Sequence, residues 1–214
     1  MDVAWDCATG NGQAAIGLAG KFKHVVATDA SEQQIANAQP HERVAYRVAT
    51  AYNSGIESNS VDAVTVAQAM HWFDADRFYA ESHRVLVPGG AIALWGYGDP
   101  VIDDSGVNAV IHEYNRSTIE DFWQPERQIL LDGYRTIPFP FDEIDVPDFT
   151  LEAHWTLDEL LGLLRTWSAT ASYAAHIGRD PIDDVERELT PLWGKREERH
   201  RIAWPLFIRA GINR

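Results

Sequence analysis

Short apolar runs alternate with amphipathic stretches through the first half of the chain. The apolar runs predict strands at Val3–Cys7, His24–Asp29, Val44–Ala49, Val61–Ala67 and Ala91–Trp95. Helical spacing predicts helices at Gln13–Phe22, from Ser31 onward, and at Asp74–Leu86, with Asp74 as N-cap and a turn at Pro88–Gly90. Strands that alternate with helices are typical of a doubly wound sheet with right-handed crossovers. The predicted fold is therefore α/β, with a Rossmann-like and mostly parallel sheet.

The second half is less regular and predicts a helical insertion before the last strand. Expected helices lie at Val107–Trp123, Leu157–Tyr173 and Pro181–Trp193. A Pro-rich stretch, 138–147, precedes an expected edge strand at Phe149–Trp155. The last strand is expected at Ile202–Ile208, where Pro205 indicates an edge or a bulge. We predict a single domain over 1–214, with a cofactor-binding core at 1–98 and a substrate side at 99–214.

Composition and charge limit the binding partners and the cellular location that we expect for the protein. A net charge of −14 over 214 residues repels phosphate backbones and disfavours nucleic acid. The basic cluster at 195–201 is interrupted by Glu197 and Glu198, which is typical of a solvated helix face. No apolar run is long enough for a membrane span, and the first residues do not resemble a signal peptide. Cys7 is the only cysteine, so a cytoplasmic location is expected.

The strongest chemical feature is the sequence Asp6–Gly12 (DCATGNG) at the end of the first strand. Glycines there allow a sharp turn and a close backbone approach to a nucleotide bound at the carboxyl ends of the strands. A tight turn with nothing bound is the plain alternative. The run Gly10–Ala15, followed by Asp29, also fits the permissive dinucleotide pattern, so a nicotinamide-dependent oxidoreductase is a second alternative. Against it, the chain has no Tyr-x-x-x-Lys pair, and Asp6 has more use beside a ligand with a positively charged amino group.

Five segments together resemble a known family. Asp6–Gly12 resembles motif I of class I methyltransferases, and Thr28–Ser31 with Gln34 resembles the strand end that follows it. Further matching segments lie at Ser58–Val64, Ala67–Asp74 and Arg84–Gly90. Over residues 3–98 the chain is similar to the trans-aconitate methyltransferase-like group, known as type 11. The resemblance is fainter afterwards, at Arg165–Ser168 and Trp204-Pro205.

The resemblance implies S-adenosylmethionine as cofactor and a role for each matching residue. Asp6, Gly10 and Gly12 would hold the amino acid moiety, Asp29 would bind the ribose, and Ala30 and Ser31 would line the adenine. Gln68 and Ala69 would contact the cofactor from the fourth strand. The remaining expected cofactor-binding residues are Ala8, Gln34, Ala51 and Tyr52. His71 and Trp72 would lie between cofactor and substrate, and Arg165 and Trp167 are further substrate candidates on a helical region, 157–178, that would roof the acceptor pocket.

Several of these roles have alternatives. Asp29 could be only a helix cap, and His71 with Trp72 could be an aromatic plug that packs the next helix. Arg165 could extend to solvent from a buried helix. His71 is the only candidate base if the acceptor is a hydroxyl. The other histidines lack ligand spacing, so no metal site is expected.

Two departures from the family pattern change the expectations. Where the family has an acid near the adenine amino group, Ala51 is followed by Tyr52-Asn53. The chain also begins near the first strand, which predicts a more open site or a cover supplied by another chain, such as a homodimer partner. The expected function is methyl transfer to a small molecule, with a carboxylic acid favoured by Arg165 beside Trp167. A methyltransferase-fold binding protein without catalysis is the remaining alternative.

Overall fold

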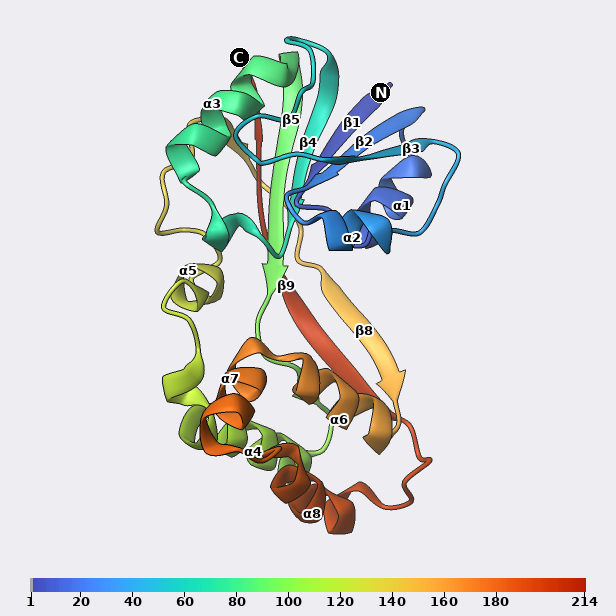
Figure 1. Ribbon diagram of the computed structural model, residues 1–214, viewed down its shortest axis with the longest axis vertical. Helices are drawn as coiled ribbons and strands as arrows, with labels where there is room; N and C mark the ends of the chain where they lie inside the picture. Colours follow the sequence, from blue (N-terminus) through green and yellow to red (C-terminus); the bar gives the residue numbers. More distant parts are fainter. Residues whose placement is uncertain (1) are drawn as a thin grey trace. The chain divides into compact units, whose positions relative to one another are not determined.

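The computed structural model describes residues 2–214 and divides the chain into two units (Figure 1). Among the described residues, the first unit contains 2–97, 128–148 and 206–214, and the second contains 98–127 and 149–205. The proposed division into a core at 1–98 and a substrate side at 99–214 stays a prediction. In the structure, two later segments, 128–148 and 206–214, are built into the first unit.

The first unit is the predicted doubly wound sheet. Its strands are β1 (Val3–Cys7), β2 (His24–Asp29), β3 (Val44–Val48), β4 (Val61–Ala67), β5 (Leu86–Tyr97), β7 (Asp142–Ile144) and the second half of β9 (His200–Ile212). The order is β3-β2-β1-β4-β5-β9, with β7 also paired to β9. The first five strands are parallel, and β9 runs antiparallel to β5. All five strands predicted in the first half of the chain are therefore confirmed.

Helices cover both faces of this sheet, as Figure 1 shows for α1 and α3. On one face, α1 (Gln13–Ala19) packs its small residues against the apolar side chains of β1 and β2. On the other face, α3 (Ala75–Val85) packs Phe78 and Tyr79 into the larger core cluster that surrounds Trp5. The unit also contains α2 (Glu32–Ala36), the 3-10 turn η1 (Met70–Trp72) and α5 (Arg127–Leu131). Asp74 caps α3 as predicted, by accepting a hydrogen bond from the backbone of Arg77.

The expected turn at Pro88–Gly90 is instead an irregular stretch inside β5. The register between β4 and β5 shifts between Val61 and Ala63, and Gly89 has a φ of +80°. Asn213 stabilises this stretch, because its backbone pairs with Gly89 and Gly90 and its side chain donates to the backbone of Leu86. The irregular geometry therefore depends on the far end of the chain, which local sequence does not reveal.

The second unit packs helices with a small antiparallel sheet. The first half of β9 lies between β6 (Val101–Ile102) and β8 (Thr150–Trp155). The helices are α4 (Ser105–Glu113), the π-helical turn η2 (Tyr114–Thr118), the 3-10 turn η3 (Glu120–Phe122), α6 (Leu157–Thr166), α7 (Ser168–Ile177) and α8 (Ile182–Trp193). β9 is thus an inner strand over much of its length, but among the described residues Pro205 pairs on one side only, with Thr150 of β8, which agrees with the edge position expected there. Pro205 is tolerated because it is the last residue of β9 that pairs with β8 before the pairing changes to β5.

Two predicted helices of this unit are interrupted. The helix expected at Leu157–Tyr173 breaks at Trp167, whose backbone is extended and whose ring packs on Tyr114 and Trp123. The helix expected at Val107–Trp123 ends at Glu113 and continues as the π and 3-10 turns. In both cases ring packing from other segments overrides the local helical periodicity.

Candidate functional site

The loop after β1 has the backbone geometry of a ligand-binding turn. Ala8, Gly10 and Gly12 have φ angles of +54°, +58° and +93°, a region that favours glycine and is costly for Ala8. A Cβ on Gly12 would lie 2.2 Å from the hydroxyl oxygen of Tyr46, so Tyr46 packs directly on that glycine. A Cβ on Gly10 would meet only the Gln34 side chain, at 3.9 Å. The two glycines therefore differ: Gly12 is required by packing, whereas Gly10 borders open space.

Asp6 supports this loop from inside the protein. It is completely buried, and its carboxylate accepts hydrogen bonds from the hydroxyl groups of Thr9 (2.5 Å) and Thr65 (2.8 Å). Burial raises the pKa of the Asp6 carboxyl, while the two hydroxyl groups oppose that change. Because the Asp6 side chain is completely buried and each oxygen already accepts from a protein hydroxyl, Asp6 stabilises the loop from within. Sequence reasoning did not identify Thr9 and Thr65 as its partners.

Asp29 joins the two loops at the carboxyl ends of β1 and β2. One carboxylate oxygen accepts from the Gly10 backbone N–H and the other from the Ser31 backbone N–H, both at 2.9 Å. The cap of α2 is Ser31, whose side chain accepts from the backbone of Gln34. The helix-cap alternative for Asp29 is therefore not its role in this structure. Each oxygen retains a lone pair for a further donor.

Gln68, at the end of β4, joins two strand ends, much as Asp29 joins two loops. Its φ is +55°, and its side-chain amide forms two hydrogen bonds with the backbone of Tyr97 at the end of β5, at 2.8 and 3.0 Å. These bonds fix the carboxyl ends of β4 and β5 to each other. The amide therefore has a structural use in addition to any contact with a ligand.

A pocket of about 320 Å³ opens at these strand ends. Seven of the predicted site residues line it: Ala8, Asp29, Ala30, Ala51, Gln68, Ala69 and Trp72. Three lining residues escaped the sequence analysis: Ala49, Ala67 and Phe73. Ala49 and Ala67 have no side chain that would mark them, whereas Phe73 stands in a segment that had been matched to the family. The pocket is polar where Asp29 lies and apolar across the alanines and aromatic rings.

Tyr52 and His71 are predicted site residues of the first unit that do not line the pocket. The Tyr52 side chain points toward α3, where its hydroxyl oxygen accepts a hydrogen bond from the backbone N–H of Asp74. The Arg77 guanidinium carbon lies 4.3 Å from the centroid of the Tyr52 ring, in a cation–π contact. His71 is buried, with its ring 4.7 Å from that of Trp72, while Trp72 is 55% exposed at the pocket. The aromatic-plug alternative thus suits His71 better than Trp72.

A wider groove of about 520 Å³ adjoins the pocket. It shares Ala30 and Ala49 with the pocket and is also lined by Arg47, Thr50 and Asn53. This groove presents a hydroxyl, an amide and an exposed guanidinium.

Comparison with known proteins assigns the family. Residues 5–94 match the family model of a methyltransferase domain. A Dictyostelium discoideum protein designated a methyltransferase is 33% identical over 190 residues, which cover 88% of this chain and 72% of that protein. A solved structure from Anaeromyxobacter dehalogenans, designated a type II methyltransferase, is 43% identical, with a TM-score of 0.92 over 99% of this chain and 89% of that chain.

This chain belongs to the methyltransferase family. It is a class I enzyme, a group that depends on S-adenosylmethionine, and its fold is the Rossmann-like fold expected from the sequence. Some relatives match over less of their length: a methyltransferase of Aspergillus candidus is 32% identical over 116 residues, which are 50% of this chain and 36% of that protein.

The second unit of this methyltransferase contains the two substrate candidates that lie outside the first 98 residues. Arg165 is partly exposed and forms ion pairs with Asp180 at 2.9 Å and Asp183 at 3.8 Å. The Trp167 ring stacks on Tyr114, with centroids 6.3 Å apart. The charge of Arg165 is thus already balanced by carboxylates, and Trp167 belongs to an aromatic cluster.

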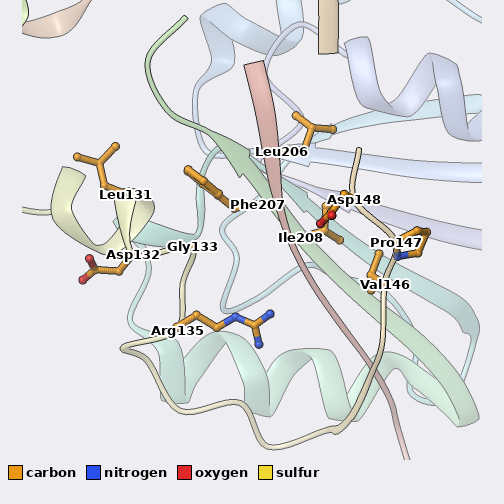
Figure 2. Close-up of a pocket in the computed structure, with 10 residues that line it drawn as sticks. All are labelled: Leu131, Asp132, Gly133, Arg135, Val146, Pro147, Asp148, Leu206, Phe207 and Ile208. Carbon is orange, nitrogen blue, oxygen red and sulfur yellow. The ribbon is translucent and has the colours of Figure 1, made fainter. Parts of the chain in front are cut away.

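The methyltransferase has a second pocket in the first unit, of about 350 Å³, shown in Figure 2. It is lined by Leu131–Gly133 and Arg135, by 146–148 and by 206–208 of β9. None of these residues had been predicted as a site. Across residues 2–214, no helix is long and apolar enough to cross a bilayer. The same described residues contain no cluster of three or more side chains suited to a metal ion.

Proposed function

We propose that the pocket at the carboxyl ends of β1, β2 and β4 binds S-adenosylmethionine and that the methyl group passes to a small-molecule acceptor. The observation that carries the proposal is Asp29, a carboxylate that lines the pocket and still has acceptor capacity on both oxygens. Two vicinal ribose hydroxyl groups are the donors that such a carboxylate suits.

The rest of the pocket fits the same cofactor. Gly10 borders open space, which leaves room for the methionine moiety beside the loop amides. Ala30, Ala51 and Phe73 provide apolar surface for a purine ring. Thr50 and Asn53 line the adjoining groove, and we propose that their hydroxyl and amide groups serve the adenine amino group in place of the family's acid.

The chain's own contribution is to position the reactants and to exclude water. S-adenosylmethionine, when bound, supplies a methyl group on a sulfonium, which is already activated for transfer to a nucleophile. Trp72, exposed at the pocket, is the side chain best placed to cover a reactant there. A carboxylate acceptor needs no base, whereas a hydroxyl acceptor does, and His71 stays the candidate for that proton.

The proposal includes a small acceptor, and a carboxylic acid is the class to test first. The net charge of −14 disfavours nucleic acid. Arg165 is the residue predicted to bind such an acid. To do so, it must break its ion pair with Asp180 and form one with the substrate carboxylate. The acceptor class is decided by a screen of small molecules with a methyl-labelled cofactor, comparing wild type with Arg165→Met.

Calorimetry with S-adenosylhomocysteine and with NADH tests the cofactor assignment. We expect the wild-type protein to bind S-adenosylhomocysteine and not NADH. Asp29→Ala should weaken that binding by about 2–4 kcal/mol, or about 30- to 700-fold, because two charge-assisted hydrogen bonds are lost. Asp104→Ala is the matched control, since Asp104 is also a carboxylate that accepts two backbone hydrogen bonds but is not a predicted site residue.

Three outcomes would contradict parts of this proposal. Preference for NADH would favour the oxidoreductase alternative. Binding of S-adenosylhomocysteine without transfer to any acceptor would favour a binding protein that has lost catalysis. Equal affinities of Asp29→Ala and wild type would remove Asp29 from the ribose site.

A further inference from the structure

The turn at Gly133-Tyr134, between α5 and β7 of the first unit, has an unusual backbone. Both residues adopt the left-handed backbone conformation, with φ angles of +62° for Gly133 and +61° for Tyr134. That region suits glycine but is costly for a tyrosine, and such outliers persist only where the surroundings hold them. Here the Tyr134 N–H donates to the Ile129 carbonyl oxygen at 3.0 Å, and the Tyr134 carbonyl oxygen accepts from Arg209 at 2.8 Å.

This backbone places the Tyr134 ring behind one wall of the cofactor pocket. The side chain is completely buried, and its ring is nearly parallel to that of His71, at 14° with 6.4 Å between centroids. At the end of β5, Gly96 leaves no room for a Cβ. Such an atom would lie 2.4 Å from Leu130, 2.8 Å from the Gln68 amide oxygen and 3.1 Å from the Tyr134 hydroxyl oxygen.

The elements that Tyr134 supports are the ones that line the pocket. Gln68, Ala69 and Trp72 line it, and His71 stands between Ala69 and Trp72 on η1. Tyr134 itself does not line the pocket. Its hydroxyl forms no hydrogen bond of good geometry among the described residues but lies near the backbone of Met70, and burial raises its pKa, so it stays protonated. The main contact of Tyr134 with this segment is therefore made by its ring, which stacks on His71.

We propose that Tyr134 is a positioning residue for the methyltransferase reaction: its ring holds the segment 68–72 in the geometry that binds the cofactor. The inference rests on the proposed function of the pocket. The same turn borders the second pocket, where Figure 2 shows Gly133 and its neighbours on one side. A residue with a merely structural role would affect stability without a selective effect on cofactor affinity.

A matched control exists in the same core. Tyr79 is also a buried tyrosine whose hydroxyl forms no hydrogen bond among the described residues, but its ring packs on Phe78, Phe139 and Phe141, none of which lines the pocket. We would compare Tyr134→Met with Tyr79→Met, because methionine refills much of either cavity. Thermal unfolding gives the loss of stability, and calorimetry with S-adenosylhomocysteine gives the affinity.

We expect Tyr134→Met to lose at least tenfold in affinity and Tyr79→Met to stay within threefold of wild type at a similar loss of thermal stability. Tyr134→Phe should bind within threefold of wild type. Unchanged affinity in Tyr134→Met, or an equal loss in Tyr79→Met, would overturn the inference while leaving the proposed function intact. Failure of the wild-type protein to bind would instead overturn the proposed function, and this inference with it.

A measurement on the wild-type protein covers the case in which Tyr134→Met does not fold. Saturating S-adenosylhomocysteine should slow amide hydrogen exchange in 68–72 and also at Tyr134, with no change around Tyr79. Slower exchange in 68–72 alone, with none at Tyr134, would show that the turn is not part of the cofactor site.

Discussion

The loop that follows β3 is predicted to depend on one ion pair of α3, between the buried Glu81 and the partly exposed Arg84. The Glu81 carboxylate accepts from the backbone and hydroxyl of Ser54, at 2.8 and 2.6 Å, and from two nitrogens of Arg84, at 2.7 and 2.8 Å. Arg84 also donates to the Ile56 carbonyl oxygen. The perturbation is Glu81→Gln, which keeps the shape and an acceptor for Ser54 but removes the charge.

The magnitude follows from the lowered pKa of Glu81. Its hydrogen bonds to Arg84 lower the pKa from 4.5 to about 2, which corresponds to about 3 kcal/mol. The Glu81 side chain is only 8% exposed, but that of Arg84 is 39% exposed, so water screens the pair. We therefore expect a loss of about 2 kcal/mol, or about 4–8 °C in Tm for a chain of this size.

The pH dependence has a definite sign. Because the pKa of Glu81 is lower in the folded state, its stabilisation is fully present above pH 4.5 and is lost as the pH falls toward 2. The difference in Tm between wild type and Glu81→Gln should thus be constant from pH 7 to 5 and should shrink between pH 4.5 and 3.

Thermal unfolding of wild type, Glu81→Gln and an exposed control from the same loop, Glu57→Gln, provides the assay. The control should change Tm by less than 1 °C. The reasoning fails if Glu81→Gln is as stable as the control at pH 7. It also fails if the difference persists unchanged at pH 3, because the carboxylate would then not be its source.

Gly12→Ala should lose both stability and affinity for S-adenosylhomocysteine, because its Cβ would collide with Tyr46, whereas Gly10→Ala should lose affinity with only about 1 kcal/mol of stability from its left-handed backbone. Thermal unfolding combined with calorimetry separates the two, and equal behaviour of both variants would contradict the distinction. Arg165→Met should change stability by less than about 1 kcal/mol, since its pair with Asp180 is partly exposed. A selective loss of methylation of carboxylic acids in that variant, measured with labelled cofactor, would show that Arg165 leaves Asp180 for the acceptor.

The sequence alone determined the sheet and the loops that surround the pocket. The strands at Val3–Cys7, His24–Asp29 and Val61–Ala67 have the predicted bounds, because a buried parallel strand is a short apolar run with a clear end. The positions of Asp29 and Gln68 at the pocket could be predicted from such strand ends, since parallel strands bring their carboxyl ends to one edge of the sheet. The local sequence carries this information, so the position of the pocket could be predicted.

The tertiary structure decided what each side chain does. Asp6 resembles a ligand contact in sequence, but only the fold brings Thr65 to its second oxygen from 59 residues away. Trp167 ends a helix that its periodicity would continue, because aromatic partners from another segment hold its ring. Tyr134 carries no motif at all, and its place behind Gln68 depends on the left-handed turn that Arg209 stabilises through the Tyr134 carbonyl. Contacts between residues far apart in the chain leave no local pattern, so packing alone could assign these roles.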